Sequence, residues 1–332
     1  MRTRLLVTGG AGFIGSHYVR SVLGGTSSGE VAGVSVTVLD KLTYAGNLAN
    51  LATVADHPRL RFVPGDICDP DLVGELVKDA DQIVHFAAES HVDRSIAGGD
   101  EFVRTNVLGT QTLLAAALRH GVERVVHVST DEVYGSIAEG SWPESHPLAP
   151  NSPYAASKAA SDLVALSYHR THGLDVRVTR CSNNYGPYQF PEKVIPLFVT
   201  RLLRGGTVPL YGDGSQVREW LHVDDHIRGV ELVRTAGSPG EIYNIGGGTE
   251  LTNRELTALL LESCEAGWNR VEHVTDRLGH DQRYSVDWSK IRDRLGYRPQ
   301  QDFTAGLART VGWYRENPGW WQSASPDLPV GG

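Results

Sequence analysis

The stretch Thr8-Gly9-Gly10-Ala11-Gly12-Phe13-Ile14-Gly15 joins a short apolar segment at 4–8 to a segment with helical spacing at 13–23. Glycines at these intervals permit a tight turn and let the backbone approach a pyrophosphate closely. The helix that follows offers unpaired N–H groups and a partial positive charge at its first turn. The sequence therefore predicts a strand, a phosphate-cradling loop and a helix, in which a dinucleotide contacts Gly9, Gly12, Phe13, Ile14 and Gly15.

Strand-like and helix-like segments go on alternating through the first half of the chain, which is typical of βαβ units and a parallel sheet. Strands are expected at 4–8, 34–39, 61–63, 82–86, 125–129 and 176–179, and helices at 13–23, 102–120 and 154–172. This alternation predicts an α/β fold with a Rossmann-type, doubly wound parallel sheet.

The pattern changes at about Cys181, where prolines and glycines cluster and the segments become short. We interpret 1–180 as a Rossmann domain that binds the dinucleotide and 181–332 as mainly a smaller, partly interleaved substrate-binding domain. The segment at roughly 220–245 is expected to return to the first domain. A surface loop is expected at 24–33, and a loosely ordered tail after Trp321.

Composition narrows the functional classes. The chain has 332 residues, 40% of them hydrophobic, and a formal net charge of -8, which argues against a nucleic-acid surface. No apolar stretch approaches the ~18 residues that a membrane span needs. The three cysteines lie far apart without metal-ligand spacing, so we expect no metal site and a reduced, cytoplasmic location.

The cofactor preference depends on Asp40, which ends the second expected strand 25 residues after Gly15. A carboxylate at this position can hydrogen-bond a ribose diol and repels the 2′-phosphate of NADP, which favours NAD. The adjacent Lys41 opposes this preference, but no arginine pair accompanies it. Asp66 and Ile67 follow the third strand, where they can flank the adenine.

Tyr154 and Lys158 lie four residues apart on an expected helix, so their side chains project from one face. Ser129-Thr130-Asp131-Glu132 ends the fifth strand, at the edge where ligands bind in open α/β sheets. A free tyrosine has a pKa near ~10, and a nearby ammonium and a positive nicotinamide ring would lower it. We therefore expect Tyr154, helped by Thr130 and Lys158, to take a proton from a sugar hydroxyl as its carbon loses a hydride.

Asp131 and Glu132 discriminate between reactions. A simple dehydrogenase or epimerase needs the hydroxyl, the tyrosine and the lysine alone, whereas two adjacent carboxylates imply an acid and a base for further proton transfers. Once C4 of a hexose is a ketone, its C5 proton is acidic. One carboxylate can then remove that proton while the other, protonated, helps the C6 hydroxyl leave as water.

With these motifs the chain resembles the dTDP-glucose 4,6-dehydratases of the extended short-chain dehydrogenase/reductase superfamily. The resemblance runs from Thr8 to about Tyr297 and is carried by segments 40–47, 87–93, 129–135, 152–158 and 180–187. It implies that Glu132 removes the C5 proton, Asp131 protonates the departing C6 hydroxyl, and bound NADH returns its hydride to C6. The product would be dTDP-4-keto-6-deoxy-glucose, a precursor of deoxysugars.

The resemblance also implies a set of binding residues. Cofactor contacts would include Asp40, Lys41, Thr43, Asp66, Ile67, Ala87, Ala88, Tyr154 and Lys158. The sugar nucleotide would contact Ser90, His91, Thr130, Asn183, Lys193, Arg218, His222, Arg277 and His280, whose cations suit a diphosphate. Leu278 stands where the family usually shows proline. Such enzymes form homodimers through a four-helix bundle, which helices starting near Phe102 and Tyr154 would supply.

Three other functions stay open at this point. A UDP-hexose 4-epimerase shares the cofactor loop and the Tyr154–Lys158 pair but has no need of Asp131 and Glu132. A GDP-mannose dehydratase resembles NADP binders, against the presence of Asp40. A non-catalytic NAD sensor typically loses the tyrosine or the lysine. The sequence leaves open the strictness for thymine over uracil and the pathway that uses the product.

Overall fold

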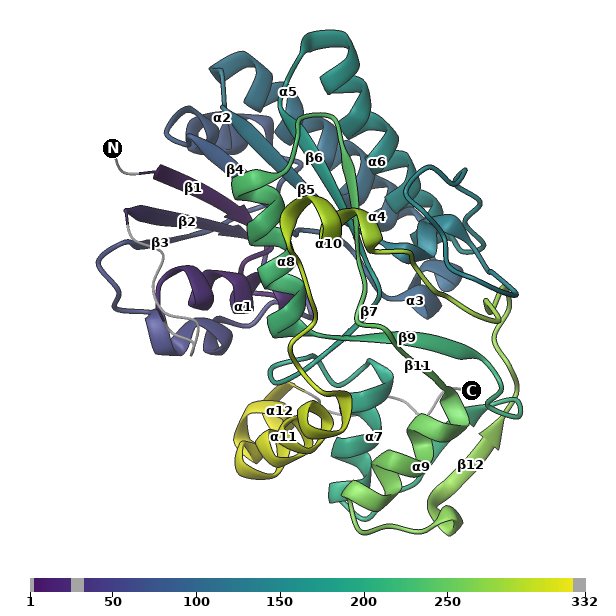
Figure 1. The fold of residues 1–332 in the computed structure, drawn as a ribbon. Coiled ribbons are helices and arrows are strands. Elements are labelled where there is room, and N and C mark those ends of the chain that lie inside the picture. The colour runs from purple at the N-terminus through teal and green to yellow at the C-terminus, as the bar shows by residue number, and fades with distance from the viewer. Residues whose placement is uncertain (1–2, 25–32, 325–332) are drawn as a thin grey trace.

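The computed structural model describes residues 3–24 and 33–324 of the chain (Figure 1). The loop expected at 24–33 therefore lies almost entirely outside the described residues, as does the tail expected after Trp321 from residue 325 onward. Residues 322–324 still belong to the last helix.

A seven-stranded sheet forms the centre of the larger domain, in the order β10-β6-β5-β4-β1-β2-β3. Its strands are β1 (Thr3–Thr8), β2 (Val34–Asp40), β3 (Leu60–Pro64), β4 (Gln82–His85), β5 (Arg124–Thr130), β6 (Val176–Cys181) and β10 (Ile242–Ile245). Every neighbouring pair is parallel. The strand order reverses between β1 and β4, which creates a crevice at the carboxyl ends. The predicted doubly wound parallel sheet is confirmed.

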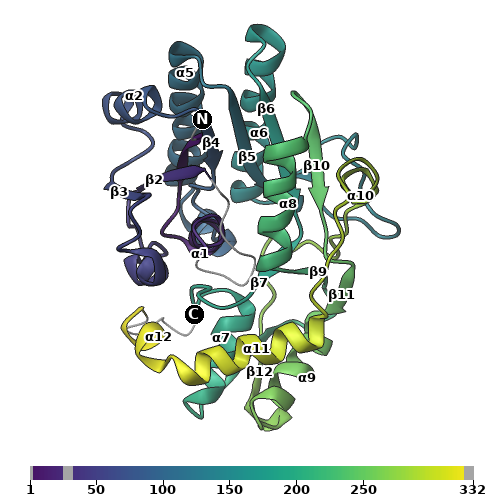
Figure 2. The same cartoon turned by 60° about the vertical axis from the view of Figure 1, so that its left-hand side comes forward.

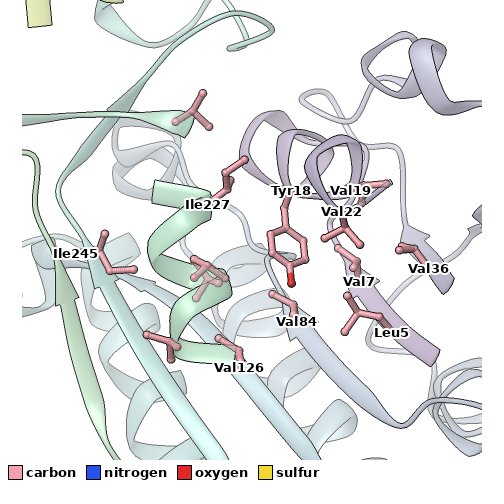
Figure 3. Packing of buried hydrophobic residues seen from close by; sticks show 14 of the residues in the cluster. Leu5, Val7, Tyr18, Val19, Val22, Val36, Val84, Val126, Ile227 and Ile245 are labelled. Carbon is pink, nitrogen blue, oxygen red and sulfur yellow. The ribbon is translucent and has the colours of Figure 1, made fainter. Parts of the chain in front are cut away.

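Helices cover both faces of this sheet (Figures 1 and 2). One face packs against α1 (Phe13–Val22), α8 (Val223–Ala236) and α10 (Ser289–Leu295), and the other against α2 (Pro70–Lys78), α5 (Thr110–His120) and α6 (Pro153–His172). Figure 3 shows Tyr18, Val19 and Val22 of α1 against strand side chains such as Val7 and Val84. The strands are apolar on both sides because both faces are buried.

Late segments of the chain return to the larger domain. β10 pairs with β6 at the sheet edge, and α8 packs across the strands. α10 adds Ile291 to the same core, although it lies about fifty residues beyond β10 in sequence. The chain therefore crosses between the two domains more than once.

The smaller domain has its own core beneath the sheet (Figure 1). Three strands, in the order β11-β9-β7, and a two-stranded pair, β12-β8, form its sheets. These strands are β7 (Asn183–Tyr185), β8 (Val208–Tyr211), β9 (Val217–His222), β11 (Thr249–Thr252) and β12 (Val271–Val274). The helices are α7 (Val194–Leu203), α9 (Asn253–Ser263), α11 (Phe303–Glu316) and α12 (Pro318–Ala324). In the larger domain, α3 (Val92–Ala97) and α4 (Asp100–Phe102) lie between β4 and β5 in sequence.

The single helix expected at 102–120 is wrong in its first part. A π-helical segment, Val103–Gly109, separates α4 from α5. Within it, Asn106 donates to the Glu89 carbonyl at 3.0 Å and to Ser157 Oγ at 2.8 Å, and accepts from the Glu89 N–H at 2.9 Å. The widened turn thus aims one buried amide at α6 and at the loop after β4.

Among the described residues no helix combines the length and the apolar character required to cross a bilayer.

Candidate active site

A cavity of about 460 Å³ lies at the carboxyl ends of β1, β2, β4, β5 and β6 and extends into the smaller domain. Its size and position match those of nucleotide-binding clefts in open α/β sheets. Of the residues that the sequence analysis placed in the site, all but His222 line this one cavity.

The phosphate-binding loop adopts the shape that its glycines suggested. Gly9 has a left-handed φ of 71°, and a Cβ there would lie 2.6 Å from the Ala87 backbone nitrogen. A Cβ on Gly15 would collide with the Gly9 carbonyl oxygen. The loop leads into the first turn of α1, which has no acidic residue and no side-chain cap. Its N–H groups are thus available to an anion.

Asp40 anchors the same loop. Its carboxylate accepts hydrogen bonds from the backbone nitrogen of Ala11 at 2.9 Å and from that of Leu42 at 2.8 Å. These two bonds fix the carboxylate at the end of β2, at the cavity wall. Lys41 forms an ion pair with Asp66 at 2.9 Å instead of crossing toward Asp40. The positive charge of Lys41, which argued against NAD in the sequence analysis, is therefore neutralised by Asp66.

The catalytic candidates meet where β5 ends beside α6. Thr130 Oγ1 donates to Asp131 Oδ1 at 3.2 Å and caps the short 3-10 helix 131–134 by accepting from the Glu132 N–H at 3.3 Å. Across the cavity, α6 begins with a Ser152 cap and Pro153, which places Tyr154 in its first turn and Lys158 in its second. Tyr154 and Lys158 are both buried.

The electrostatics of Tyr154 differ from the sequence expectation. Complete burial, followed by the Glu132 charge, raises the pKa of the phenol well above its ordinary value. Burial also lowers the pKa of Lys158 to about 8. In this structure the loss of solvation therefore outweighs the hydrogen bond with Thr130, which lowers the pKa of Tyr154. The remaining lowering of the tyrosine pKa has to come from a positive group that binds in the cavity.

Asp131 and Glu132 have different environments although they are neighbours. Burial, then Glu132 and Glu219, raises the pKa of Asp131 well above its ordinary value, which favours the protonated form of this carboxyl. Burial also raises the pKa of Glu132, but the charges of Arg277, Lys193 and Arg218 oppose that shift. A pair in which burial favours the protonated form of one carboxyl, Asp131, while nearby cations favour the ionised form of the other, Glu132, is suited to moving two protons.

Cations surround the far end of the cavity. Lys193 Nζ donates to the Ser90 carbonyl at 2.6 Å. Arg218 lies over the Tyr284 ring, 4.4 Å from its centroid, and donates to the Asp281 carbonyl at 2.9 Å. Arg277 pairs loosely with Asp93 at 3.6 Å. Three basic side chains converge in an acidic chain, an arrangement suited to a diphosphate.

Two histidines of the expected substrate set lie in different places. His280 lines the cavity and is held by Asp276 at 2.6 Å. His222 ends β9, is buried, and accepts a hydrogen bond from the backbone nitrogen of Asp224 as the cap of α8. The structure does not place His222 in the site. His222 was expected in the site only from the family resemblance, and its side chain instead caps the helix that follows.

Some lining residues were missed by the sequence analysis. They include Phe190, Tyr211, Asn253 and Tyr284. Asn253 opens α9 directly after a capping box between Thr252 and Glu255, a helix-start signal that the sequence displays. The others come from loops and from a strand of the smaller domain, whose packing the sequence pattern does not reveal. No cluster of His, Cys, Asp or Glu suited to a metal occurs within residues 3–24 and 33–324.

Comparison with known proteins identifies relatives. A family model described as GDP-mannose 4,6 dehydratase matches residues 6–310. A dTDP-glucose 4,6-dehydratase of Streptomyces antibioticus is 68% identical over 318 residues, which are 96% of this chain and 94% of that protein.

Solved structures agree. DesIV, a dTDP-glucose 4,6-dehydratase from Streptomyces venezuelae crystallised with NAD, has a TM-score of 0.95 and 67% identity, and the match covers 97% of this chain and 100% of that one. A UDP-glucose 4-epimerase from Thermotoga maritima has a TM-score of 0.87 at 31% identity, covering 95% of this chain and 100% of the other. The resemblance inferred from the motifs is confirmed, and the chain belongs to the dTDP-glucose 4,6-dehydratase family of the extended short-chain dehydrogenases/reductases.

Proposed function

We propose that this protein converts dTDP-glucose to dTDP-4-keto-6-deoxy-glucose with bound NAD, as a hydro-lyase of deoxysugar biosynthesis. The observation that carries the proposal is the acid–base pair Asp131–Glu132, placed at the end of β5 in the same cavity as Tyr154. An epimerase has no use for that pair. The relatives with high identity over the full length are named for this reaction.

The residues of the cavity fit NAD. A Cβ at Gly9 or Gly15 would collide with the backbone of the cradle itself, and the first turn of α1 supplies N–H donors for a pyrophosphate. Asp40 is fixed where a ribose diol would meet it, and Ile67 and Ala87 line the wall nearby. The chemistry that NAD supplies when bound is reversible hydride transfer and a positive ring. That charge is the group that the buried Tyr154 requires.

Tyr154, Glu132 and Asp131 each carry out a different proton transfer. Tyr154, hydrogen-bonded through Thr130, takes the proton of the C4 hydroxyl. Glu132 removes the C5 proton, because the nearby arginines and lysine favour its ionised form. Asp131, kept protonated by burial and by Glu132, gives its proton to the departing C6 hydroxyl. Glu132 returns its proton to C5 at the end of the cycle. The proton that Tyr154 took from the C4 hydroxyl replaces, through solvent, the one that Asp131 gave to the departing water, so all three groups recover their starting states.

The binding assignments rest on position. We propose as sugar-nucleotide contacts the following residues, all of which line the cavity: Ser90, His91, Thr130, Asn183, Lys193, Arg218, Arg277 and His280. Asn253 and Tyr284 join them on the same ground. His222 is not retained, because it lies outside the cavity.

We further propose a homodimer that buries the helices beside the π-helical segment. Val103 and Leu108 of that segment are 58% and 52% exposed, and Leu163 of α6 is 55% exposed. Val103, Leu108 and Val164 line one shallow groove. A stripe of large apolar side chains on two adjacent helices is suited to a second pair of helices, as in a four-helix bundle. The free thiols of Cys68, Cys181 and Cys264 support a cytoplasmic location.

The proposal is tested by product analysis without added cofactor. The purified protein is incubated with dTDP-glucose and, separately, with UDP-glucose, and products are identified by mass spectrometry and NMR. A 4-keto-6-deoxy product from dTDP-glucose, lighter by one water, supports the proposal. Unchanged dTDP-glucose together with conversion of UDP-glucose to UDP-galactose would assign the protein as an epimerase.

A further inference from the structure

The last helix of the described chain contacts the cofactor half of the molecule. α11 runs across the lower part of Figure 2, and α12 follows at its left-hand end. From α12, Trp320 Nε1 donates to Asn50 Oδ1 at 2.9 Å. Asn50 belongs to a 3-10 helix, Leu48–Val54, that follows β2, and it is 2% exposed. The bond therefore joins residues 270 positions apart in sequence.

Asn50 also hydrogen-bonds the phosphate-binding loop and so links α12 to it. Its Nδ2 donates to the Ala11 carbonyl at 2.9 Å, while its Oδ1 is occupied by Trp320. Both ends of one buried amide are thereby used, and a flipped amide would lose both bonds. The side chain can only bridge α12 and the loop in this one orientation.

The peptide unit of Ala11 is held on both of its polar groups. Its N–H donates to Asp40, and its carbonyl accepts from the Asn47 N–H at 3.0 Å and from Asn50. Ala11 lies between Gly9 and Gly12, the glycines that line the cavity. The position of its backbone therefore determines the shape of the anion cradle.

An aromatic cluster fixes Trp320 where it makes this bond. Its ring meets those of Trp313 and Tyr188 edge to face, with centroids 5.1 Å and 5.9 Å away. The Arg20 guanidinium of α1 lies 4.2 Å over the Tyr188 ring and also donates to the Asn50 carbonyl. Trp320 is thus packed between the two domains, with α1 on its far side.

We propose that Asn50 and Trp320 are positioning residues that hold the Ala11 peptide in its cradle geometry and so slow the release of NAD. The proposal rests on the proposed function only in taking NAD as the dinucleotide. Local opening of α12 would break the Trp320–Asn50 bond and free one face of the loop. Docking of α12 is consequently part of the cofactor site although it touches no cofactor.

The test compares Trp320→Phe with Trp313→Phe in the full chain. The first removes the indole N–H that reaches Asn50. The second trims a ring of the same cluster that, in the described part of the chain, contributes ring contacts only. Each protein is loaded with labelled NAD and chased with unlabelled NAD, and the retained label is followed over time. Trp320→Phe is expected to release NAD about tenfold faster, equivalent to about 1.4 kcal/mol. Trp313→Phe keeps an aromatic ring against Trp320 and leaves the indole N–H bond to Asn50 in place, so it should release NAD close to the parent rate.

A second variant, Asn50→Asp, tests the proposal independently if Trp320→Phe folds poorly. Asn50→Asp preserves side-chain shape but turns the donor to the Ala11 carbonyl into a carboxylate, so it should release NAD at least as fast. Because both residues act through one path, the double variant should be no faster than Asn50→Asp alone. Additive effects, equal effects of the two tryptophan variants, or parent-like release by Asn50→Asp would overturn the proposal. A parent protein that takes up no NAD would contradict the proposed function itself, before any variant is compared.

Discussion

Lys158 Nζ on α6 donates a 2.8 Å hydrogen bond to the carbonyl oxygen of Val128 on β5. This bond ties the helix that carries Tyr154 to the strand that ends in Thr130, Asp131 and Glu132. The lysine is 4% exposed, so its charge acts in a poorly solvated environment. The bond between Lys158 and Val128 therefore helps to bring α6 and the end of β5 together at the point where the substrate would react.

Replacement of Tyr154 by phenylalanine should stop the first step. The ring would keep its packing against Phe102, which it meets edge to face at 6.3 Å, while the hydroxyl is lost. General acid–base groups typically contribute ~10²–10⁴-fold, so turnover should fall by at least about 100-fold. Enzyme-bound NADH formed on mixing with dTDP-glucose measures this step. Parent-like NADH formation would contradict the role of Tyr154.

Glu132→Gln should separate oxidation from elimination. The amide is nearly isosteric but cannot accept the C5 proton, so oxidation at C4 should remain measurable while release of 4-keto-6-deoxy product falls by about 100-fold or more. Single-turnover mixing would show bound NADH that rises and persists. If the variant made product at the parent rate, the base would have to be another residue.

Lys158→Met should cost activity and gain stability. Burial lowers the pKa of Lys158 from 10.5 to about 8, which means that the folded protein holds its proton less well than the unfolded chain does. At pH 7 the charged lysine therefore destabilises the fold by roughly 3 kcal/mol, partly offset by ~1 kcal/mol from its hydrogen bond. The NAD-free methionine variant should be more stable than NAD-free parent by about 2 kcal/mol at pH 7.

The lowered pKa of Lys158 also fixes how its contribution to stability changes with pH. Between pH 8 and 10.5 the unfolded chain binds a proton at this lysine that the folded protein does not, so the contribution of Lys158 to stability rises with pH. The gap in unfolding free energy between Lys158→Met and parent should narrow from pH 7 to pH 9. Lys158→Arg, which stays charged throughout, should show no such recovery. A constant gap for methionine would mean that the lysine stays charged in the fold up to pH 9, so that burial does not lower its pKa.

His280 and His222 should respond differently to substitution. His280→Asn removes a cavity-lining ring and should raise the KM for dTDP-glucose several-fold with little change in thermal stability. His222→Ala removes the cap of α8 and a contact with Tyr185, and should cost about 1 kcal/mol of stability while KM stays near that of the parent. Steady-state kinetics and thermal unfolding of both variants decide the matter. A KM defect confined to His222→Ala would reverse the assignment.

Leu163→Arg should weaken the proposed dimer. The residue is 55% exposed on α6, so a charged side chain is tolerated by the single chain but would be buried in a four-helix interface. Leu278→Arg is the matched control, because Leu278 is 79% exposed and lies far from that face in sequence. Analytical ultracentrifugation should show monomers for the first variant and the parent state for the second. Equal behaviour of both variants would argue against this interface.

Much of the site was accessible from the sequence because parallel strands place their carboxyl ends at one edge. Asp40 and Thr130 end strands, and Gly9 and Ala87 come just after strands. This order alone predicts that they converge. Tyr154 and Lys158 could be paired from their spacing. The sheet strands themselves were recognisable because buried parallel strands are continuous apolar runs.

Other features depended on tertiary contacts that no local pattern contains. The π-helical segment exists where Asn106 bonds to Glu89 and Ser157, a side-chain network set by packing. His222 and His280 both belong to polar segments of the smaller domain, and only their orientation separates a helix cap from a cavity wall. The sequence analysis named groups that lower the pKa of Tyr154 but did not anticipate that burial raises it, because that burial depends on tertiary packing.

The most direct test of the account is the fate of the C5 hydrogen. The protein is incubated with dTDP-glucose in heavy water, and the product is examined by NMR and mass spectrometry. Proton removal and return by Glu132 predicts a 4-keto-6-deoxy product that carries solvent deuterium at C5, formed without net consumption of NAD. A 4-keto-6-deoxy product with the original hydrogen still at C5 would contradict the elimination mechanism and the role given to the acid–base pair.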